Sequence, residues 1–168
     1  MLDLLISTIA QGLLWSLLAL GVYITFRVLD IADLSVEGTF PLGAAVAATC
    51  ITSGHSLVTA FVLAVLAGCV AGAVTGLLTT KLKIPALLSG ILTMIGLYSI
   101  NLRVMGRANL SLLGQTTIYS WGASAGLTEA QTTLAVGLIA ALLVVAVVYW
   151  FFGTEIGLAL RATGYNPQ

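Results

Sequence analysis

Glu37 is the strongest candidate for a functional residue in this sequence, because it is a carboxylate within a stretch that otherwise has the composition of a membrane span. A charge in hydrocarbon is costly unless it faces protein or water, so an ionisable residue at membrane depth usually marks a functional site. Gly38, Pro41 and Gly43 surround it and disfavour regular helix. Irregular backbone inside a bilayer persists only where protein or a water-filled cavity covers it. The pattern predicts a broken helix beside a solute pathway, although Glu37 at the inner interface, among solvated aspartates, fits the sequence equally well.

The motifs of a zinc hydrolase and of an ATPase are missing. His55 is the only histidine in the sequence, which excludes a His-Glu-x-x-His zinc pair. No phosphate-binding Gly-x-x-x-x-Gly-Lys occurs, so ATP would have to be bound by another protein. Cys50 and Cys69 lack paired spacing and are typical of small buried hydrophobic residues. We therefore expect a transport subunit with no cofactor and no metal.

Composition places the elements that carry Glu37 in a membrane. Hydrophobic residues make up 60% of the 168 residues and charged residues 7%, whereas soluble domains have about 45–50% and about 25%. Six basic residues balance six acidic ones, so there is no basic field to attract nucleic acid. The sequence predicts an all-α, polytopic integral membrane protein forming one domain over residues 1–168.

Apolar runs of about 20 residues match the thickness of a bilayer. They predict five transmembrane helices, at about 4–26, 34–53, 56–80, 86–105 and 132–152. We expect the second to be broken, and the turn after it to be a minimal Gly54-His55. Pro85 stands at the start of the fourth, a position that proline tolerates. The mixed apolar and polar segment 106–129 is expected to lie along the outer membrane interface.

Basic residues near the ends of the spans predict the orientation. One side would hold four of them, Arg27, Lys81, Lys83 and Arg161, and the other side Arg103 and Arg107. Because cytoplasmic loops are enriched in lysine and arginine, the larger set is expected in the cytoplasm. The N-terminus would then lie outside and the C-terminus inside.

The third span carries small residues at every fourth position. They are Ala60, Ala64, Gly68, Gly72 and Gly76. Small residues on one helix face let neighbouring backbones approach closely, which is how helices associate in lipid. We expect this stripe to be a packing face.

The tail after the fifth span has the pattern of a short amphipathic helix over 154–164. Thr154 can cap its start and Glu155 suits its first turn, while Gly164 is well placed as its end. Four residues fall on one face at helical spacing, namely Ile156, Ala159, Leu160 and Thr163. An ordinary interfacial tail would show the same pattern.

Five strings in the sequence are long or specific enough to compare with known families: Ile31-Ala-Asp-Leu-Ser-Val-Glu-Gly-Thr-Phe-Pro-Leu-Gly-Ala-Ala-Val-Ala47, Lys83-Ile-Pro, Gly90-Ile-Leu-Thr-Met, Tyr98-Ser-Ile-Asn-Leu-Arg-Val-Met-Gly-Arg107 and Glu155-Ile-Gly-Leu-Ala-Leu-Arg-Ala-Thr-Gly164. They closely resemble permeases of ABC transporters of the branched-chain amino acid type, and most of all the tryptophan/tyrosine branch, which includes uncharacterised permeases. The resemblance covers nearly the whole chain.

The resemblance implies an importer for a small organic solute such as an amino acid, in a bacterial inner membrane. Its partners would be a second permease copy, two cytoplasmic ATPases and an external solute-binding protein. It implies that the tail is the coupling helix, which contacts the ATPase through Glu155, Leu158, Arg161 and Gly164. It also implies that the second span lines the route through Glu37, Thr39, Phe40 and Pro41. Members of the family continue with several more spans after the coupling helix, so we expect this sequence to hold the first half of a permease.

Two other functions remain open at this stage. A channel or proton-linked carrier would use Glu37 of several subunits as an ion site. A structural membrane subunit would assemble through the small residues of the third span. The first predicts flux that needs no ATP, and the second predicts that Glu37 and Arg161 tolerate substitution.

Overall fold

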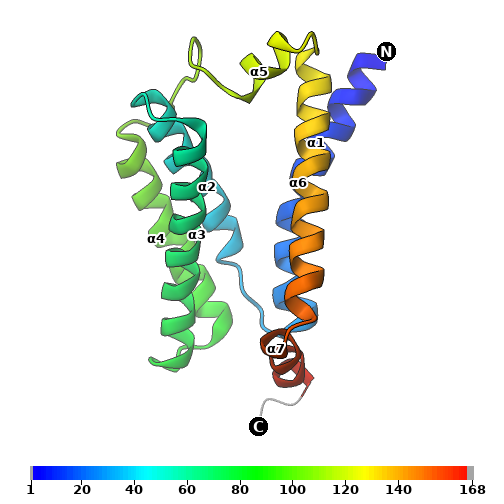
Figure 1. Ribbon diagram of the computed structural model, residues 1–168. Coiled ribbons are helices and arrows are strands. Elements are labelled where there is room, and N and C mark those ends of the chain that lie inside the picture. The colour runs from blue at the N-terminus through cyan, green and yellow to red at the C-terminus, as the bar shows by residue number, and fades with distance from the viewer. Residues whose placement is uncertain (1, 166–168) are drawn as a thin grey trace. The chain divides into compact units, whose positions relative to one another are not determined.

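The structure, a computed structural model, describes residues 2–165 and is built from helices (Figure 1). The elements in chain order are α1 (Leu2–Tyr23), the π-helix η1 (Ile24–Val28), α2 (Val36–Thr52), α3 (Leu57–Thr80), α4 (Ala86–Met105), α5 (Ile118–Ser124), α6 (Glu129–Phe152) and α7 (Glu155–Tyr165). Within residues 2–165, four helical stretches are long and apolar enough to cross a membrane: Leu4–Val28, α3, α4 and α6. The second predicted span, 34–53, corresponds to the shorter apolar α2, whose 17 residues lie at the lower limit of about 17 for crossing a bilayer. The predicted all-α membrane fold is confirmed.

The chain divides into two compact units, one from the N-terminus to Ile31 together with Ile118 onward, the other Ala32–Thr117. In the first unit, α1 and α6 lie side by side and run in the same direction (Figure 1). Ala10 is fully buried between them. A Cβ on Gly137 would lie 3.4 Å from the Leu13 Cβ, so small residues on both helices permit this close packing.

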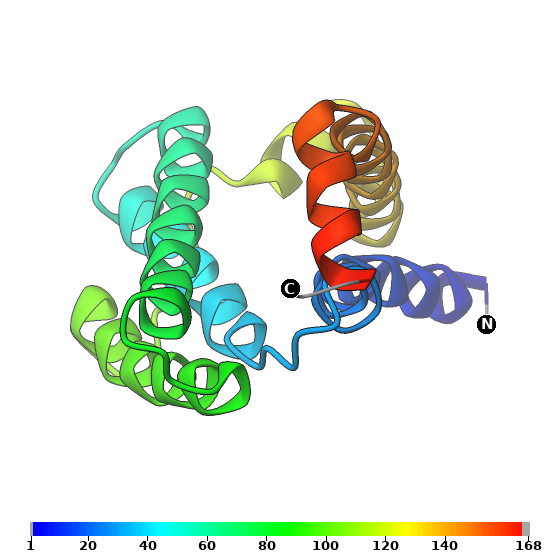
Figure 2. The same ribbon diagram turned by 90° about the horizontal axis from the view of Figure 1, so that it is seen from below.

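At one end of the first unit lies α7, which contacts both α6 and η1. Figure 2 shows α7 crossing beneath the ends of α6 and α1. Its short link to α6, Gly153-Thr154, leaves little freedom in where the helix can lie. The chain therefore presents a separate, laterally lying helix after a membrane-length one.

The second unit contains α2, α3 and α4, which alternate in direction (Figure 1). Leu42, Ala71 and Leu97 form its buried apolar cluster, one residue from each helix. Hydrogen bonds reinforce the packing: the Thr75 hydroxyl donates to the Thr93 hydroxyl at 2.9 Å. These two buried hydroxyls are therefore paired across the interface between α3 and α4, as burial in an apolar interior favours.

The two turns of this unit lie where the sequence predicts them, after the second and third spans. Gly54, at φ +81°, makes the tight turn after α2, and this left-handed backbone favours glycine. The Ser56 hydroxyl accepts a bond from the amide of Thr59 and so caps α3. Pro85 directly precedes the first residue of α4.

The break predicted around Pro41 is wrong in its position. The α2 helix continues through Pro41, and the non-helical backbone lies earlier, between η1 and Val36. Pro41 cannot donate to the carbonyl of Glu37, four residues before it, but the turn that precedes it is hydrogen-bonded, since the amides of Gly38 and Thr39 donate to the Ser35 carbonyl. The irregular segment is instead stabilised by the Asp33 carboxylate, which accepts from the Ser35 amide at 2.8 Å.

Two further boundaries differ from the prediction. The last long helix begins at Glu129 rather than near 132 because Thr128 and Gln131 form a capping box, which fixes a helix start. The segment 106–129 contains α5, so it is partly helical. Its location at the outer membrane interface stays a prediction.

Candidate functional site

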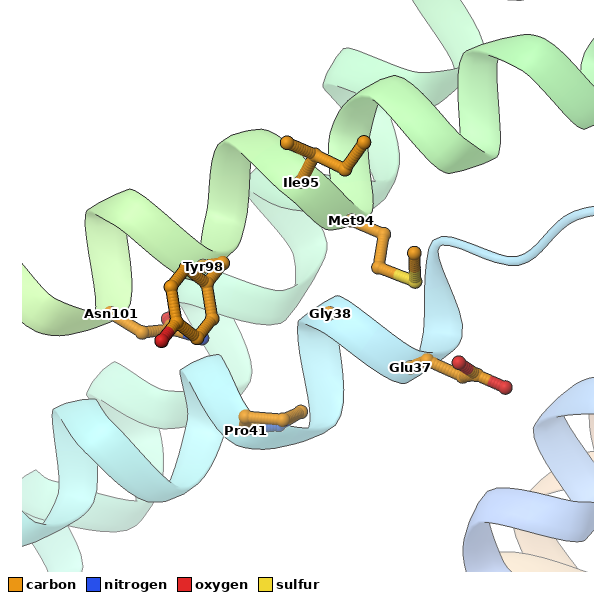
Figure 3. A pocket seen from close by; sticks show the side chains of 7 residues that line it. All are labelled: Glu37, Gly38, Pro41, Met94, Ile95, Tyr98 and Asn101. Atoms are coloured by element: carbon orange, nitrogen blue, oxygen red, sulfur yellow. The ribbon is translucent and has the colours of Figure 1, made fainter.

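A groove on the second unit contains part of the predicted transport route (Figure 3). It has a volume of about 460 Å³ and is lined by Glu37, Gly38 and Pro41 of α2 and by Met94, Ile95, Tyr98 and Asn101 of α4. Two of the four predicted route residues therefore lie in one groove.

Glycines bring the two walls of the groove together. A Cβ on Gly38 would lie 2.9 Å from the Met94 Cα, closer than side chains normally approach. One turn nearer the start of α4, a Cβ on Gly90 would lie 2.7 Å from the backbone nitrogen of Leu34. A side chain at Gly38 would push α2 and α4 apart at the groove, and one at Gly90 would push α4 away from the segment that precedes α2.

The remaining predicted route residues lie outside the groove lining. Phe40 is exposed and lies on the same side of α2 as Glu37 by helical spacing. Thr39 is half-buried, and its hydroxyl donates to the Val36 carbonyl at 3.2 Å. The transport role of all four residues stays a prediction, and only Glu37 and Pro41 share a groove.

Glu37 supplies acceptors at one end of the groove. Its carboxylate is exposed and has no hydrogen-bond or ion-pair partner within the described part of the chain. Because Pro41 has no N–H, the main-chain carbonyl of Glu37 loses its usual helical donor as well. A carboxylate in the first turn also stabilises the start of α2. The residue therefore has a structural role and remains available to a ligand.

Asn101 is one of the lining residues that were not predicted as site residues from the sequence. Its side chain is 7% exposed, and its Oδ1 is buried with no hydrogen-bond partner among the described residues. An unpaired buried polar group costs about 1–3 kcal/mol, so such groups are rare in native structures. The signal was present in the sequence, because a polar amide within a predicted span calls for a partner.

The predicted cap of the tail helix is confirmed. The Thr154 side-chain oxygen accepts from the amide of Gly157 at 3.3 Å, and the Leu158 amide donates to the Thr154 carbonyl at 2.9 Å. Glu155 is the first residue of α7, where negative charge stabilises the free N–H groups. These contacts start a new helix directly after α6.

The inner face of α7 is made by glycines, which corrects two predictions. Gly164 does not end the helix; it lies within α7, where a Cβ would overlap the carbonyl oxygen of Val28. A Cβ on Gly157 would likewise overlap the Phe151 carbonyl. Of the four residues predicted to share an apolar face, Ile156, Ala159 and Thr163 are exposed and only Leu160 is half-buried. Backbone contact through glycine, rather than an apolar stripe, holds α7 in place.

Three of the four residues predicted to contact an ATPase lie on the exposed part of α7. Glu155, Leu158 and Arg161 are exposed, whereas Gly164 is half-buried against η1. The guanidinium carbon of Arg161 lies 5.1 Å from the centre of the Phe152 ring, a cation–π distance that limits the mobility of the side chain. The helix thus presents an acidic, an apolar and a basic residue on a fixed support.

The small-residue stripe of α3 meets its neighbours only at one end. Ala60 is buried and Ala64 half-buried, but a Cβ on Gly68, Gly72 or Gly76 would meet nothing within 4 Å. A spacing of four residues drifts by about 40° per step around an α-helix. The helix therefore packs within its unit through Ala71 and Thr75 instead. Packing through the glycines stays a prediction for a surface outside this unit.

The sequence also contains a Gly-x-Ser-x-Gly motif, which the structure does not place at a turn between a strand and a helix. Gly122-Ala-Ser-Ala-Gly126 has the Gly-x-Ser-x-Gly spacing of a hydrolase nucleophile, which requires a sharp turn between a strand and a helix. Here Gly122 and Ser124 belong to the helix α5, and Gly122 packs against Thr132 of α6. Its position is that of a helix–helix contact.

Comparison with known proteins agrees with this arrangement. The family described as the permease component of branched-chain amino acid transport systems matches residues 4–168. The tyrosine transport system permease protein of Clostridioides difficile (strain R20291) is 40% identical over 164 residues, which cover 98% of this chain and 53% of that protein. An uncharacterised protein of Rickettsia prowazekii (strain Madrid E) is 35% identical over 166 residues, which cover 99% of this chain and 56% of that protein. No solved structure matches.

The chain spans about half the length of the curated relatives that it matches. The family match nevertheless runs over nearly the whole chain, and membrane-length helices occur in both compact units. These findings support a multi-pass membrane protein and a transport subunit rather than an enzyme. The chain belongs to the family of permease components of branched-chain amino acid transport systems.

Proposed function

We propose that this chain is a membrane-spanning permease subunit of an ABC importer for a small organic solute of the amino acid class. Its proposed partners are a second permease copy, two cytoplasmic ATPases and an extracytoplasmic solute-binding protein. Family membership supports the transport role, and the relative named as a tyrosine transport system permease supports the substrate class. The observation that carries the proposal is α7, a capped helix outside the membrane-length helices with an exposed face.

The support of α7 suits the transmission of force. Gly157 and Gly164 place its backbone directly against Phe151 and Val28, so a push on the helix reaches η1 and α6 without compressing flexible side chains. In the proposed cycle, ATP-driven closure of the partners moves α7 as a rigid body. The spans then rearrange around a central route, as in alternating access.

The proposed location is a bacterial inner, or plasma, membrane, with the N-terminus outside and the C-terminus in the cytoplasm. Arg27 of η1 and Arg161 of α7 belong to elements that contact each other, so they lie at the same end of the first unit. An excess of arginine and lysine at one membrane face favours the cytoplasmic side. The exposed face of α7 would then meet soluble ATPase subunits.

The proposal is tested by reversing the charge of Arg161 in the complete transport system, reconstituted in liposomes with its ATPase and binding protein. We expect Arg161→Glu to reduce solute uptake about tenfold or more per ATP hydrolysed, because a desolvated charge contact is lost and a repulsion takes its place. Lys81→Glu is the matched control, since Lys81 is also exposed and predicted to lie on the same side. Normal coupling in Arg161→Glu would contradict the proposal.

A proton-linked carrier or channel is the second candidate, favoured by the unpartnered carboxylate of Glu37 at the groove. It predicts flux without ATP that disappears in Glu37→Gln. The importer predicts that uptake stops when ATP is withheld and that the Glu37→Gln protein still requires ATP. The same liposomes distinguish the two functions.

A further inference from the structure

A second groove of the second unit lies between α3 and α4 and is lined almost entirely by apolar side chains. We propose that this groove binds one acyl chain of an anionic phospholipid, whose phosphate is held by Arg103 in the last turn of α4. The lipid site goes beyond the proposed importer function, although the choice of Arg103 rests on the orientation proposed with that function.

The groove exists because α3 and α4 each pack mainly on α2 and make fewer contacts with each other. Its volume is about 720 Å³, and its lining includes Val46 of α2, Val70 of α3 and Gly96 of α4. Among the described residues that line it, Thr93 alone has a polar side chain, and its hydroxyl is already bonded to Thr75. The groove therefore offers nothing to a polar solute, whereas hydrocarbon is a suitable occupant.

The shape of the groove suits a single hydrocarbon chain. The lining extends along α4 from Leu92 to Val104, twelve residues apart, which corresponds to roughly 18 Å of helix. One leaflet of a bilayer core is about 15 Å deep, so a lipid chain can lie in the groove over its whole depth. Spread over this length, the volume gives a cross-section of roughly 40 Å², about half of what a helix about 10 Å across occupies. An acyl chain therefore fits the groove better than another helix does.

The groove lies on a different face of α3 from the small-residue stripe. Val70 and Val74 line the groove and are both exposed. Gly72 is two residues from each of them, which is about 200° around an α-helix. Another subunit packed on the glycines of α3 would therefore leave the groove open to lipid.

Arg103 provides a positive charge at one end of the groove. It follows Gly96 by seven residues and Ile100 by three, and because both of these line the groove, Arg103 belongs to the same face of α4. Arg103 is exposed and has no ion-pair partner among the described side chains. A guanidinium forms paired hydrogen bonds with phosphate oxygens. The phosphate of a lipid whose chain occupies the groove would therefore supply the missing partner.

The distribution of charge favours Arg103 over the lysine at the other end of the groove. Lys81 follows the lining residue Leu78 by three residues and so shares the groove face of α3. In the proposed orientation Lys81 lies on the cytoplasmic side, where lysine and arginine are enriched without any ligand. Arg103 lies on the outer side, where the same rule disfavours a cation. A bound anionic headgroup accounts for a cation at that position.

The test compares two phospholipids with the same acyl chains, the anionic dioleoyl phosphatidylglycerol and the zwitterionic dioleoyl phosphatidylcholine. Their binding to the purified full chain in detergent is titrated by native mass spectrometry. We expect the anionic lipid to bind at least about fivefold more tightly, and Arg103→Gln to remove most of this preference. Arg103→Lys keeps the charge without the paired contact and should retain part of the preference. Lys81→Gln is the matched control, because it removes an exposed cation at the other end of the groove.

Val70→Trp tests the apolar part of the site separately. Val70 is 64% exposed and lines the groove, so a larger side chain can occupy the groove without displacing the core. We expect both lipids to bind about threefold more weakly or worse, with the preference for the anionic lipid unchanged, because hydrocarbon contact is lost and the charge is kept. Val65→Trp is the control, at an exposed residue of the same helix that does not belong to the groove lining.

Equal binding of the two lipids to the unchanged chain would indicate an adventitious additive only and would overturn the inference. An unchanged preference in Arg103→Gln, or an unchanged affinity in Val70→Trp, would overturn it as well. If Lys81→Gln loses the preference and Arg103→Gln keeps it, the headgroup lies at the other end and the role of Arg103 is rejected.

Native mass spectrometry of the complete transport system tests whether the groove stays open in the assembly. Phosphatidylglycerol retained there, and lost in Arg103→Gln, supports the site. Absence of the lipid from the assembly, despite binding to the chain alone, would mean that a neighbouring helix fills the groove and would contradict the inference. None of these measurements requires ATP or a transported solute, so the lipid site and the importer function can fail independently.

Discussion

The helices α3 and α7 both carry glycines at helical spacing, but they use them in opposite ways. On α7, Gly157 and Gly164 face inward, and each leaves no room for a Cβ because a backbone carbonyl occupies the space. On α3, Gly72 and Gly76 face outward, and a Cβ at either would meet nothing within 4 Å. The spacing of glycines alone therefore does not predict whether their helix face packs against another part of the chain or is exposed.

The difference follows from what surrounds each helix. The short α7 must lie flat on the ends of two other elements, and only backbone-to-backbone contact brings it close enough. The long α3 packs through Ala60, Ala71 and Thr75, and Ala71 follows Ala60 after about three turns of 3.6 residues, so both fall on the same face. Its glycines are thus available to a surface outside the second unit, which is the predicted packing face.

The largest effect is expected at Gly164. A Gly164→Leu side chain would overlap the Val28 carbonyl, and overpacking of this kind costs about 1–3 kcal/mol or more. We expect α7 to detach from η1, with ATP-coupled uptake falling at least about tenfold while the protein still inserts in the membrane. Protease sensitivity of the tail and uptake in the same liposomes measure both. A tail that stays protected would show that the contact is not rigid.

An effect of intermediate size is expected from substituting Gly90. This substitution tests whether the second unit, like α7, has a glycine packed so closely against backbone that a Cβ does not fit. Gly90→Ala would place a Cβ 2.7 Å from the Leu34 nitrogen and 2.8 Å from the Asp33 carboxylate. We expect a loss of about 1–3 kcal/mol, seen as a lower midpoint of thermal unfolding in detergent. Gly96→Ala is the control on the same helix, because a Cβ there would meet nothing within 4 Å.

A smaller effect is expected from removing the cap of α7. Thr154→Ala deletes the oxygen that accepts from the Gly157 amide, a change worth about 1 kcal/mol. Thr154→Ser keeps the oxygen and should behave as the unchanged protein. Hydrogen exchange at the first turn of α7 reports the difference, and equal protection in the two variants would argue against the cap.

The smallest effect on the chain itself is expected at Gly72. Gly72→Ala adds a methyl group in open space and should stabilise the helix slightly, by about 0.5–1 kcal/mol at most. Gly72→Leu should insert normally yet reduce assembly with other subunits if the α3 stripe packs against one. Cross-linking yield of the assembled system measures this. Full assembly with Leu at this position would remove the packing hypothesis.

Helix boundaries were largely predictable because local signals set them. The fourth span was predicted as 86–105 and is Ala86–Met105, since Pro85 marks its start. The cap at Thr154 was likewise readable from residue type. The start of α6 was missed only because the Thr128–Gln131 capping box was not used.

Packing was less predictable because it depends on rotation around each helix and on distant partners. The inward face of Gly164 depends on Val28, which is far away in the sequence. The groove at Glu37 was half predicted: the carboxylate stood out by its charge, whereas Asn101 became informative only once its oxygen was seen to be buried without a partner. A periodic pattern predicts which residues share a helix face, but which face points inward is set by the other helices that pack against it.

The most direct test asks on which side of the membrane α7 lies, because contact with an ATPase requires the cytoplasmic side. Ala162, exposed next to Arg161, is replaced in Ala162→Cys after the free cysteines Cys50 and Cys69 have been changed to alanine. A maleimide reagent that does not cross membranes is then applied to spheroplasts and to inside-out vesicles. The proposed orientation predicts labelling in the vesicles alone. Labelling in intact spheroplasts would place α7 outside the cell and contradict the importer.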